Sequence, residues 1–466
     1  MKEKMNKKHS PQRPNVVFLI ADDHRDEAIR AFGNETVHTP ILDSLAASGT
    51  ACRNTHIFGG LTGALCAPSR ACVHTGISLF RAMIGKEVMN REHSSVIRPD
   101  VRLMPQTMRE AGYHTHAVGK WHNDKASFSR SFEGGDKLLF HGMSDHTKVP
   151  VHDYDPTGAY PKEKEYIERT FSTELFSDAA VNFIEDYLED RPFFLYVAYT
   201  APHDPRTAPE PYASLYDKAD IPLPPNFVSE HPFDTGDMTV RDEKLALLPR
   251  DEDEIRQHIA DYYAMISHLD AQIGRVIEAL KAKGIYDDTL IVYTADHGLA
   301  LGQHGLMGKQ NLYEHSVRIP LIFRGPGVPE GQQELALASN IDIFPTVAGL
   351  CNVDLPKETE GVSLCPIFAG ETEGVRSIVC SVYKDIQRMA TDGRWKLIRY
   401  YCSPKTNTGT ERIQLFDLLN DPWETQDLSA DPANAGEIER LASELASWMQ
   451  ACSDILQDMP VIPGTS

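Results

Sequence analysis

The sequence predicts an α/β protein with a large, mostly parallel mixed sheet sandwiched by helices and a smaller C-terminal antiparallel α+β subdomain. Three observations support this fold class. Short apolar runs alternate with helical patterns over most of the chain, which is typical of parallel strands joined by covering helices. The apolar runs are continuous, as in strands buried on both faces. Near residue 375 the pattern changes to short strands separated by turn signals.

The elements of the larger domain, residues 1–375, follow from apolar runs and from helical spacing. We expect strands at 14–23, 115–118, 192–199, 289–294 and 320–323, and helices at 40–48, 104–111, 172–188 and 254–283. The last helix has the clearest pattern, because apolar residues from Ile255 to Leu280 form one stripe and Gly284 ends it. We expect 123–169 and 220–252 to be long loops, which are often functional in compact enzymes.

The C-terminal subdomain is expected to cover residues 376–466. Strand-like runs occur at 377–382, 387–391, 395–400 and 414–418, and turn signals such as Asp392-Gly393 separate them. A helix at 435–452 closes the chain. This pattern predicts a four-stranded antiparallel sheet with one helix.

The chain is strongly acidic. Its 466 residues include 67 Asp and Glu against 46 Lys and Arg, which gives a formal net charge of −21. Nucleic acids and anionic membranes need a basic footprint, so we expect neither as a partner. An anionic substrate would need positive charge gathered in a pocket. The 8 Cys residues include no Cys-x-x-Cys pair, which argues against a zinc ribbon. The sequence gives no prediction of the oligomeric state.

The localisation expectation rests on the first residues. No apolar run reaches the length of a transmembrane helix. Residues 1–14 are basic and polar, but the apolar run that follows is short and leads into Asp22 and Asp23, unlike a signal peptide. We therefore expect a cytoplasmic protein as the sequence is written, and a periplasmic or secreted one if a leader had been removed.

Two predicted strands lead into residues that can bind a metal. Asp22 and Asp23 end the first strand, and Asp296 and His297 follow the strand at 289–294. Ligands of open α/β sheets bind at the carboxyl ends of the strands. Together, the four side chains would form a hard site for Ca²⁺ or Mg²⁺. Each pair alone also fits solvated loop residues or helix N-caps, so the prediction depends on the two pairs meeting.

The most specific motif runs from Cys66 to Gly76. It contains Cys66-Ala67-Pro68-Ser69-Arg70, then four residues, then Thr75-Gly76. A lone Cys is usually a small buried apolar residue, but this spacing resembles the signature of the type I, formylglycine-dependent sulfatases of the alkaline phosphatase superfamily. The resemblance implies that a formylglycine-generating maturation enzyme oxidises Cys66 to an aldehyde, formylglycine.

Further segments resemble the same family in the expected chain order. They are 13–23, Gly119-Lys120-Trp121-His122, Pro202-His203, 294–298, Gly308-Lys309, 341–346 and 414–422. The resemblance therefore covers nearly the whole chain. It implies an alkaline-phosphatase-like fold and a sulfuric ester hydrolase that removes sulfate from a sulfated carbohydrate or an aryl sulfate.

The resemblance also assigns roles to the matching side chains. Arg70 would orient the hydrated aldehyde, and Lys120 and Lys309 would neutralise the charge of the sulfate. His203 would protonate the leaving oxygen, and His122 would remove a proton as the aldehyde re-forms. The family preference for the metal is Ca²⁺, with Mg²⁺ as the alternative. Taken singly, each of these Lys and His residues also fits an ordinary surface or turn position.

Two alternative functions stay open. His297 stands where many sulfatases have Asn, and a His there also resembles the phosphonate monoester hydrolases of the superfamily. A phosphonate monoester or phosphodiester hydrolase with the same aldehyde and metal is therefore the first alternative, although the paired carboxylates Asp22 and Asp23 favour a sulfatase. The second is a silent glycan-binding relative whose Cys66 stays a thiol.

Two polar clusters are candidates for substrate recognition. His141 and His146 lie in the first long loop, and Lys384 and Arg388 lie near the start of the C-terminal subdomain. Such groups can hydrogen-bond sugar hydroxyls, so we expect them to line a specificity pocket. The alternative is an ordinary polar surface.

Overall fold

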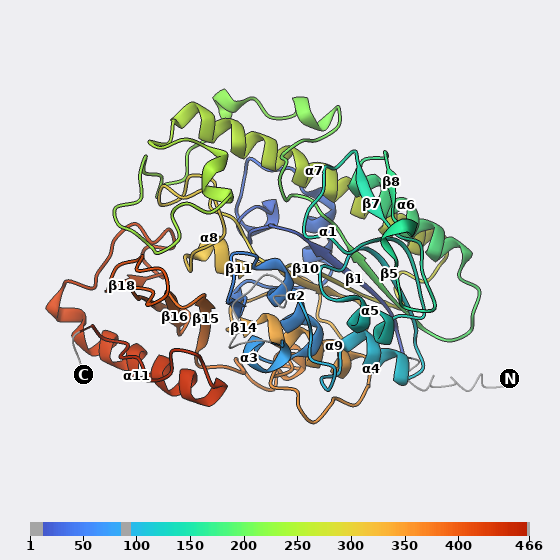
Figure 1. The fold of residues 1–466 in the computed structure, drawn as a ribbon. Helices are drawn as coiled ribbons and strands as arrows, with labels where there is room; N and C mark the ends of the chain where they lie inside the picture. Colours follow the sequence, from blue (N-terminus) through green and yellow to red (C-terminus); the bar gives the residue numbers. More distant parts are fainter. Residues whose placement is uncertain (1–12, 85–94, 464–466) are drawn as a thin grey trace, which may run out of the picture.

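An eight-stranded mixed sheet lies at the centre of the protein (Figure 1). The computed structural model describes residues 13–84 and 95–463. The strand order is β13-β2-β12-β10-β1-β9-β5-β6, and the run from β10 to β6 is parallel. The strands are β13 (Gln332–Glu334), β2 (Thr50–Cys52), β12 (Leu321–Arg324), β10 (Thr289–Ala295), β1 (Asn15–Ala21), β9 (Phe193–Ala198), β5 (His114–Lys120) and β6 (Gly134–Leu139).

The central strand β1 shows why its apolar run is continuous. Its residues from Val16 to Ala21 are all buried. Successive side chains of a strand point to opposite faces, so Val17 and Leu19 join the core on one face, while Phe18 and Ile20 join the core on the other. The sheet is covered on both faces, which confirms the predicted fold class.

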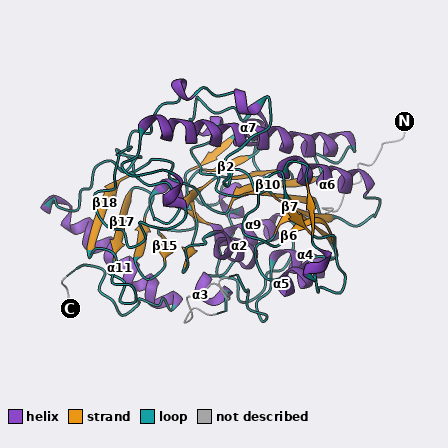
Figure 2. Ribbon diagram, turned by 45° about the horizontal axis from the view of Figure 1, so that its top comes forward, coloured by secondary structure: helices purple, strands orange, loops and turns teal. Residues whose placement is uncertain are grey.

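Helices form a layer on each face of the sheet, as Figure 2 shows. One layer contains α1 (Pro40–Ala47), α6 (Ser172–Asp186) and α7 (Glu252–Ala282). The other contains α2 (Cys66–Thr75), α4 (Met104–Glu110), α5 (Lys125–Ser131) and α9 (Ile343–Leu350). The shorter helices are α3 (Leu79–Ala82), α8 (Glu314–Val317) and α10 (Cys365–Phe368). No helix among the residues that the structure describes is long and apolar enough to cross a membrane. The segment 1–12, which enters the localisation expectation, lies outside those residues.

One of the two expected long loops contains regular structure, which corrects the prediction. Within 123–169, α5 begins after Asp124, whose side chain accepts the N–H of Ser127. β6 forms an edge of the main sheet, and β7 (Val149–Val151) pairs with β8 (Tyr166–Glu168). The apolar pattern did not reveal β6 because this strand begins with two glycines and is only partly buried. Within 221–251 the structure shows only a short bridge at Phe227 and a 3-10 turn at Asp242–Leu245.

The C-terminal sheet has the order β18-β17-β16-β15-β4. Its four antiparallel strands are β15 (Val379–Tyr383), β16 (Gln387–Thr391), β17 (Trp395–Tyr400) and β18 (Arg412–Asp417). The helix α11 (Ala435–Cys452) lies against this sheet (Figure 1), and its apolar side chains pack with those of the strands. A third, small sheet joins β11 (Arg318–Ile319), β3 (Thr55–His56) and β14 (Ala338–Ser339).

The fifth strand of the C-terminal sheet, β4 (Gly59–Gly60), comes from the larger domain and pairs in parallel with β15. Two glycines carry no apolar pattern, so nothing in the sequence predicts this strand. Gly59 has φ +103°, and a Cβ there would lie 1.9 Å from the carbonyl oxygen of Val382. The approach of the two backbones therefore requires glycine at this position.

We expect Gly59→Ala to lower the stability of the protein more than Gly33→Ala. Gly33 has nearly the same φ, +106°, but no atom lies within 4 Å of the position that a Cβ would take there. Both variants place alanine in the left-handed region at a cost of about 1 kcal/mol. Only Gly59→Ala also pushes β4 from β15, which adds about 1–3 kcal/mol. Urea midpoints measure the difference, and equal midpoints for the two variants would contradict the expectation.

Candidate active site

The carboxyl ends of four neighbouring parallel strands meet at one place, where α/β sheets bind ligands. The strands are β10, β1, β9 and β5, in that order across the sheet. The polar residues that end or follow them are Asp296 and His297 (β10), Asp22 and Asp23 (β1), His203 (β9), and Lys120 and His122 (β5). Residues far apart in the sequence thus reach one site because their strands are neighbours.

Cys66 is the first residue of α2 and reaches the same place. Its Sγ lies 3.0 Å from Nε2 of His297 and 3.7 Å from Nζ of Lys309. One turn further along the helix, the hydroxyl of Ser69 donates to the carbonyl oxygen of Asp296. This hydrogen bond ties the beginning of α2 to the end of β10.

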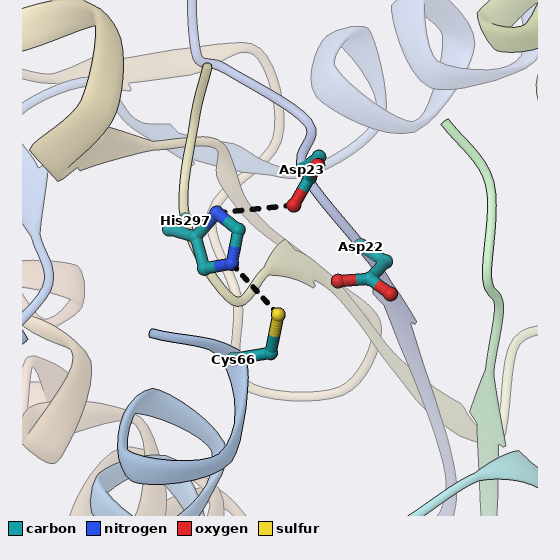
Figure 3. Close-up of side chains that lie close together, drawn as sticks. All are labelled: Asp22, Asp23, Cys66 and His297. Atoms are coloured by element: carbon teal, nitrogen blue, oxygen red, sulfur yellow. Dashed lines mark hydrogen bonds and ion pairs between the residues drawn. The ribbon is translucent and has the colours of Figure 1, made fainter. Parts of the chain in front are cut away.

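Four side chains form a cluster that could hold a metal ion (Figure 3). Asp22, Asp23, Cys66 and His297 are all buried, and each offers a ligand atom within 4.8 Å of the others. Oδ1 of Asp22 and Oδ2 of Asp23 accept no hydrogen bond from any described residue. Buried carboxylate oxygens without partners are costly. Two such oxygens beside an imidazole fit the donor set that a hard divalent cation takes.

Asp296, the other predicted metal ligand, lies beside this cluster and is engaged by protein groups. Its Oδ1 accepts the backbone N–H of Asp23 at 3.2 Å, and its Oδ2 accepts Nε–H of Arg70 at 2.9 Å. Arg70 is fully buried and also donates to the carbonyl oxygen of Lys120 at 3.0 Å. Arg70 therefore connects the ends of β10 and β5, while its Nη2 has no acceptor among the described residues.

Two buried lysines supply local positive charge in this acidic protein. Lys120 contacts the carboxylate of Asp22, and Nζ of Lys309 donates to Oδ1 of Asp23 at 2.8 Å. Each ammonium group contacts one of the paired carboxylates. The site therefore gathers the cations that an anionic substrate needs.

Burial and neighbouring charges shift the pKa values in the cluster. Burial, followed by the charges of Asp296 and Cys66, raises the pKa of Asp22 well above its usual value. Burial also disfavours the thiolate of Cys66, but the charges of Lys120, Lys309 and His297 together outweigh this and lower the pKa of Cys66 to about 7. A substantial fraction of this thiol is therefore in its reactive, ionised form near neutral pH.

Two histidines flank the cluster. Nδ1 of His203 lies 2.8 Å from the carbonyl oxygen of Asp204, which can only accept, so Nδ1 carries a hydrogen. Nε2 of His203 lies 3.9 Å from Oδ2 of Asp23 and faces the cluster. Burial, together with Lys120, lowers the pKa of His122 well below its usual value. His122 is therefore neutral at pH 7.

The backbone is strained at two of these residues. Asp23 has φ 68° and His122 has φ 64°, in the left-handed region that non-glycine residues rarely adopt. Such a conformation costs about 1–3 kcal/mol and persists where the surroundings hold it. At Asp23 the hydroxyl of Tyr262 donates to the backbone carbonyl at 2.6 Å, and Asp296 accepts the backbone N–H.

A cavity of about 470 Å³ opens over the cluster. Cys66, His122, His203 and Lys309 line its inner part. Further lining residues are Arg241, Asp242, Gln310 and Lys384, which offer hydrogen-bond donors and acceptors.

Of the four predicted specificity residues, the structure places one in the cavity wall. Lys384 lines the cavity, and its ammonium group contacts Asp237. His141 is not among the lining residues. Its half-exposed ring lies 2.6 Å from the carboxylate of Glu165, although the next residue, Gly142, does line the cavity.

His146 and Arg388 do not reach the cavity, which corrects the prediction for these two residues. Both are buried. His146 lies behind the site, with Nε2 3.0 Å from the carbonyl oxygen of His203. The guanidinium of Arg388 forms a two-pronged ion pair with Asp454, at 2.6 and 2.7 Å. Sequence reasoning could not separate a surface cation from a buried one whose partner lies far along the chain.

Three polar lining residues were not singled out from the sequence: Arg241, Asp242 and Gln310. Arg241 and Asp242 belong to the stretch 220–252, which was expected to be functional as a whole. Nothing in its composition distinguished these two from the other charged residues around them. Gln310 follows the Gly308-Lys309 motif directly, and that adjacency was the available signal.

Comparisons with known proteins show which family the sequence matches. The sulfatase family model matches residues 14–353, and the model of the N-sulphoglucosamine sulphohydrolase C-terminal region matches 302–451. The chain is 27% identical to the N-acetylglucosamine-6-O-sulfatase of Bacteroides thetaiotaomicron, over 92% of this chain and 83% of that protein.

Two solved structures share the fold. One is BT4656 in complex with its substrate D-glucosamine-2-N,6-O-disulfate, with a TM-score of 0.79 and 24% identity over 96% of this chain and 100% of that one. The other is the phosphonate monoester hydrolase of Agrobacterium radiobacter, with a TM-score of 0.74 and 22% identity over 94% of this chain and 96% of that one.

Proposed function

The chain belongs to the sulfatase family, and we propose that this sulfatase hydrolyses a sulfate ester of a carbohydrate, using an aldehyde formed at Cys66 and a divalent cation. One observation carries the proposal. Cys66 lies in the same buried cluster as Asp22, Asp23 and His297. A residue that becomes a nucleophile would therefore lie beside the cation that activates it.

The donor atoms of the cluster fit both groups. The unpartnered oxygens of Asp22 and Asp23, with His297 and the adjacent Asp296, would hold Ca²⁺ or Mg²⁺. The free Nη2 of Arg70 is available to a hydroxyl on residue 66. When present, the hydrated aldehyde would supply one hydroxyl to attack sulfur and a second that lets the aldehyde re-form, and the cation would lower the pKa of the attacking hydroxyl.

Side chains of the protein would neutralise the charge of the sulfate and transfer the protons of the reaction. Lys120 and Lys309 would bind the non-bridging oxygens of the sulfate and neutralise their charge. His203 would donate a proton from Nε2 to the leaving alcohol oxygen as the sulfur–oxygen bond breaks. His122, held neutral, would accept a proton from the remaining hydroxyl of residue 66 as sulfate departs. Water then restores the hydrate, so the net reaction consumes one water molecule.

Four polar side chains in the cavity wall support a carbohydrate as the leaving group. Arg241, Asp242, Gln310 and Lys384 can bond hydroxyl groups, and one relative and one structural neighbour act on sulfated glucosamines. The second candidate activity is phosphonate monoester hydrolysis. It is favoured by His297 in place of Asn and by the fold shared with a phosphonate monoester hydrolase.

A substrate comparison tests the class of reaction. We expect kcat/KM for a sulfated glucosamine to exceed that for phenyl phosphonate by about a hundredfold or more, because a site built to bond sugar hydroxyls disfavours a ligand that lacks them. A panel of sulfated monosaccharides, 4-nitrophenyl sulfate and phenyl phosphonate measures this preference. Faster turnover of phenyl phosphonate than of every sulfate ester would replace the proposal by its alternative.

Replacement of the proposed nucleophile gives a sharper test. Cys66→Ala should lower kcat by at least about a thousandfold, because the bond to sulfur can no longer form. Cys72→Ala is the matched control, since Cys72 is buried on the same helix outside the cluster. In protein from a host with the maturation enzyme, the tryptic peptide ending at Arg70 should carry no alkylatable thiol, whereas the peptide with Cys72 should. Full activity of Cys66→Ala would refute the proposed role.

Removal of the cation tests the metal cluster. Chelation should abolish turnover, and Ca²⁺ at a hundred times its Kd should stabilise the protein by about 2.7 kcal/mol. Asp22→Asn should lose both effects. Asp178→Asn should keep them, because Asp178 is a surface residue paired with Arg275. Equal stabilisation of Asp22→Asn and the wild-type protein by Ca²⁺ would place the ion elsewhere, and the same titration with Mg²⁺ shows which ion the site prefers.

A further inference from the structure

We propose that three consecutive residues, Arg241, Asp242 and Glu243, form a clamp that fixes His203 and Lys309 on the two sides of the active site. The residues belong to the acidic, proline-rich stretch 220–252, and none of them takes part in the bond-breaking or proton-transfer steps described above. The inference rests on the proposed functions of His203 and Lys309. In this proposal the three residues act on the hydrolysis only by positioning His203 and Lys309.

The first arm of the clamp holds His203 through Asp204. Arg241 donates Nη1–H to Oδ2 of Asp204 at 2.6 Å and Nη2–H to Oδ1 at 2.8 Å. Oδ1 of Asp204 lies 3.3 Å from Nδ1 of His203, and the backbone carbonyl of Asp204 accepts from the same Nδ1 at 2.8 Å. A two-pronged ion pair fixes the orientation of the carboxylate. Arg241 therefore sets the direction in which Nε2 of His203 points.

The second arm holds Lys309 through Gln310. Oδ2 of Asp242 accepts Nε2–H of Gln310 at 2.8 Å, and Oε1 of Gln310 accepts the backbone N–H of Lys309 at 3.0 Å. Nε2 of Gln310 also donates to the carbonyl oxygen of Gly63, three residues before Cys66, at 3.0 Å. Through Gln310, Asp242 thereby links the backbone of Lys309 to the segment just before the helix that begins at Cys66.

The third arm holds the turn that precedes Lys309. The carboxylate of Glu243 accepts the backbone N–H of Gly308 at 2.8 Å and that of Met307 at 3.0 Å. Arg250 balances this buried charge at 2.5 Å and donates to the carbonyl oxygen of Gly305 at 3.1 Å. The turn is thus held at three backbone groups by one buried ion pair.

The packing between clamp and turn leaves no room at residue 308. A Cβ on Gly308 would lie 2.2 Å from Oε1 of Gln310, 2.9 Å from Cβ of Asp242 and 3.1 Å from Oε1 of Glu243. The glycine lets the two acidic residues come close to the backbone that leads into Lys309. Arg241 and Asp242 are also joined to each other, by Nη2 and Oδ1 at 2.7 Å. The arms toward His203 and Lys309 therefore form one connected unit.

The two sides of the clamp act on different parts of the reaction, and this difference makes the proposal testable. His203 would protonate the leaving oxygen, which matters more for a basic leaving group than for an acidic one. Lys309 would bind the sulfate itself, which is the same in every ester. Damage to the Arg241 arm should therefore depend on the leaving group, whereas damage to the Glu243 arm should not.

The experiment measures kcat/KM of Arg241→Met and Glu243→Gln on phenyl sulfate and 4-nitrophenyl sulfate. Arg241→Met should lose about tenfold or more on phenyl sulfate but less than about threefold on 4-nitrophenyl sulfate, whose leaving group needs little protonation. Glu243→Gln should lose about tenfold on both. Arg241→Lys should recover part of the loss, because lysine keeps one bond to Asp204. The matched control is Arg275→Met, since Arg275 forms a surface ion pair with Asp178 and is as exposed as Arg241, 46% against 47%.

Calorimetric binding of inorganic sulfate gives a readout that does not need turnover. Glu243→Gln should weaken sulfate binding by about fivefold or more, and Arg241→Met should leave it within about twofold. If Glu243→Gln does not fold, as thermal unfolding would show, Asp242→Ala replaces it. Equal losses from Arg241→Met on the two esters, or unchanged sulfate binding in the Glu243 or Asp242 variant, would overturn the clamp. A wild-type protein that neither cleaves any sulfate ester nor binds sulfate would instead refute the proposed function, and the clamp with it.

Discussion

The burial of three carboxylates beside a thiol is the constraint on which the rest of the site depends. Unpaired charges are unstable away from water, so each carboxylate needs a cation held in fixed geometry. The pairs are Asp22 with Lys120, Asp23 with Lys309, and Asp296 with Arg70. Each carboxylate thus has a cationic partner, yet Oδ1 of Asp22 and Oδ2 of Asp23 accept no hydrogen bond from the described residues. These two oxygens are the ones available to a further cation.

The sheet brings Asp22 and its cationic partner Lys120 together, because they lie at the ends of different strands of one sheet. Lys120 ends β5 and Asp22 follows β1, with β9 between them. The continuous burial of β1 and its neighbours fixes their register, since a slip by one residue would turn every side chain to the opposite face. The two apolar cores, one on each face of the sheet, thus hold the charged residues in position. The core side chains themselves take no part in the proposed reaction. Tyr262, from the helical layer, adds a hydrogen bond to Asp23.

The sequence was informative wherever a pattern or a motif lay within one short segment. The strand β1, the helix α11 and the Cys66 segment could all be predicted, because apolar period and local spacing define them. The edge strand β6 and the two-residue strand β4 could not, since their stability comes from pairing rather than from their own side chains. The same distinction holds in the site. Arg388 was misassigned because its partner Asp454 is distant in the sequence, and Arg241 was missed because its importance depends on contacts across the fold.

The pairing of β4 with β15 joins residues that are far apart in the sequence, such as Gly59 and Val382. A ribosome must release most of the polypeptide before Gly59 can meet Val382, and such distant pairings form slowly. The segment just ahead of Cys66 therefore reaches its final pairing only after β15 has been synthesised. The hydrogen bond from the hydroxyl of Ser69, just beyond Cys66, likewise cannot form until Asp296 is present to accept it. The surroundings of Cys66 are thus complete only when segments from the second half of the chain are in place.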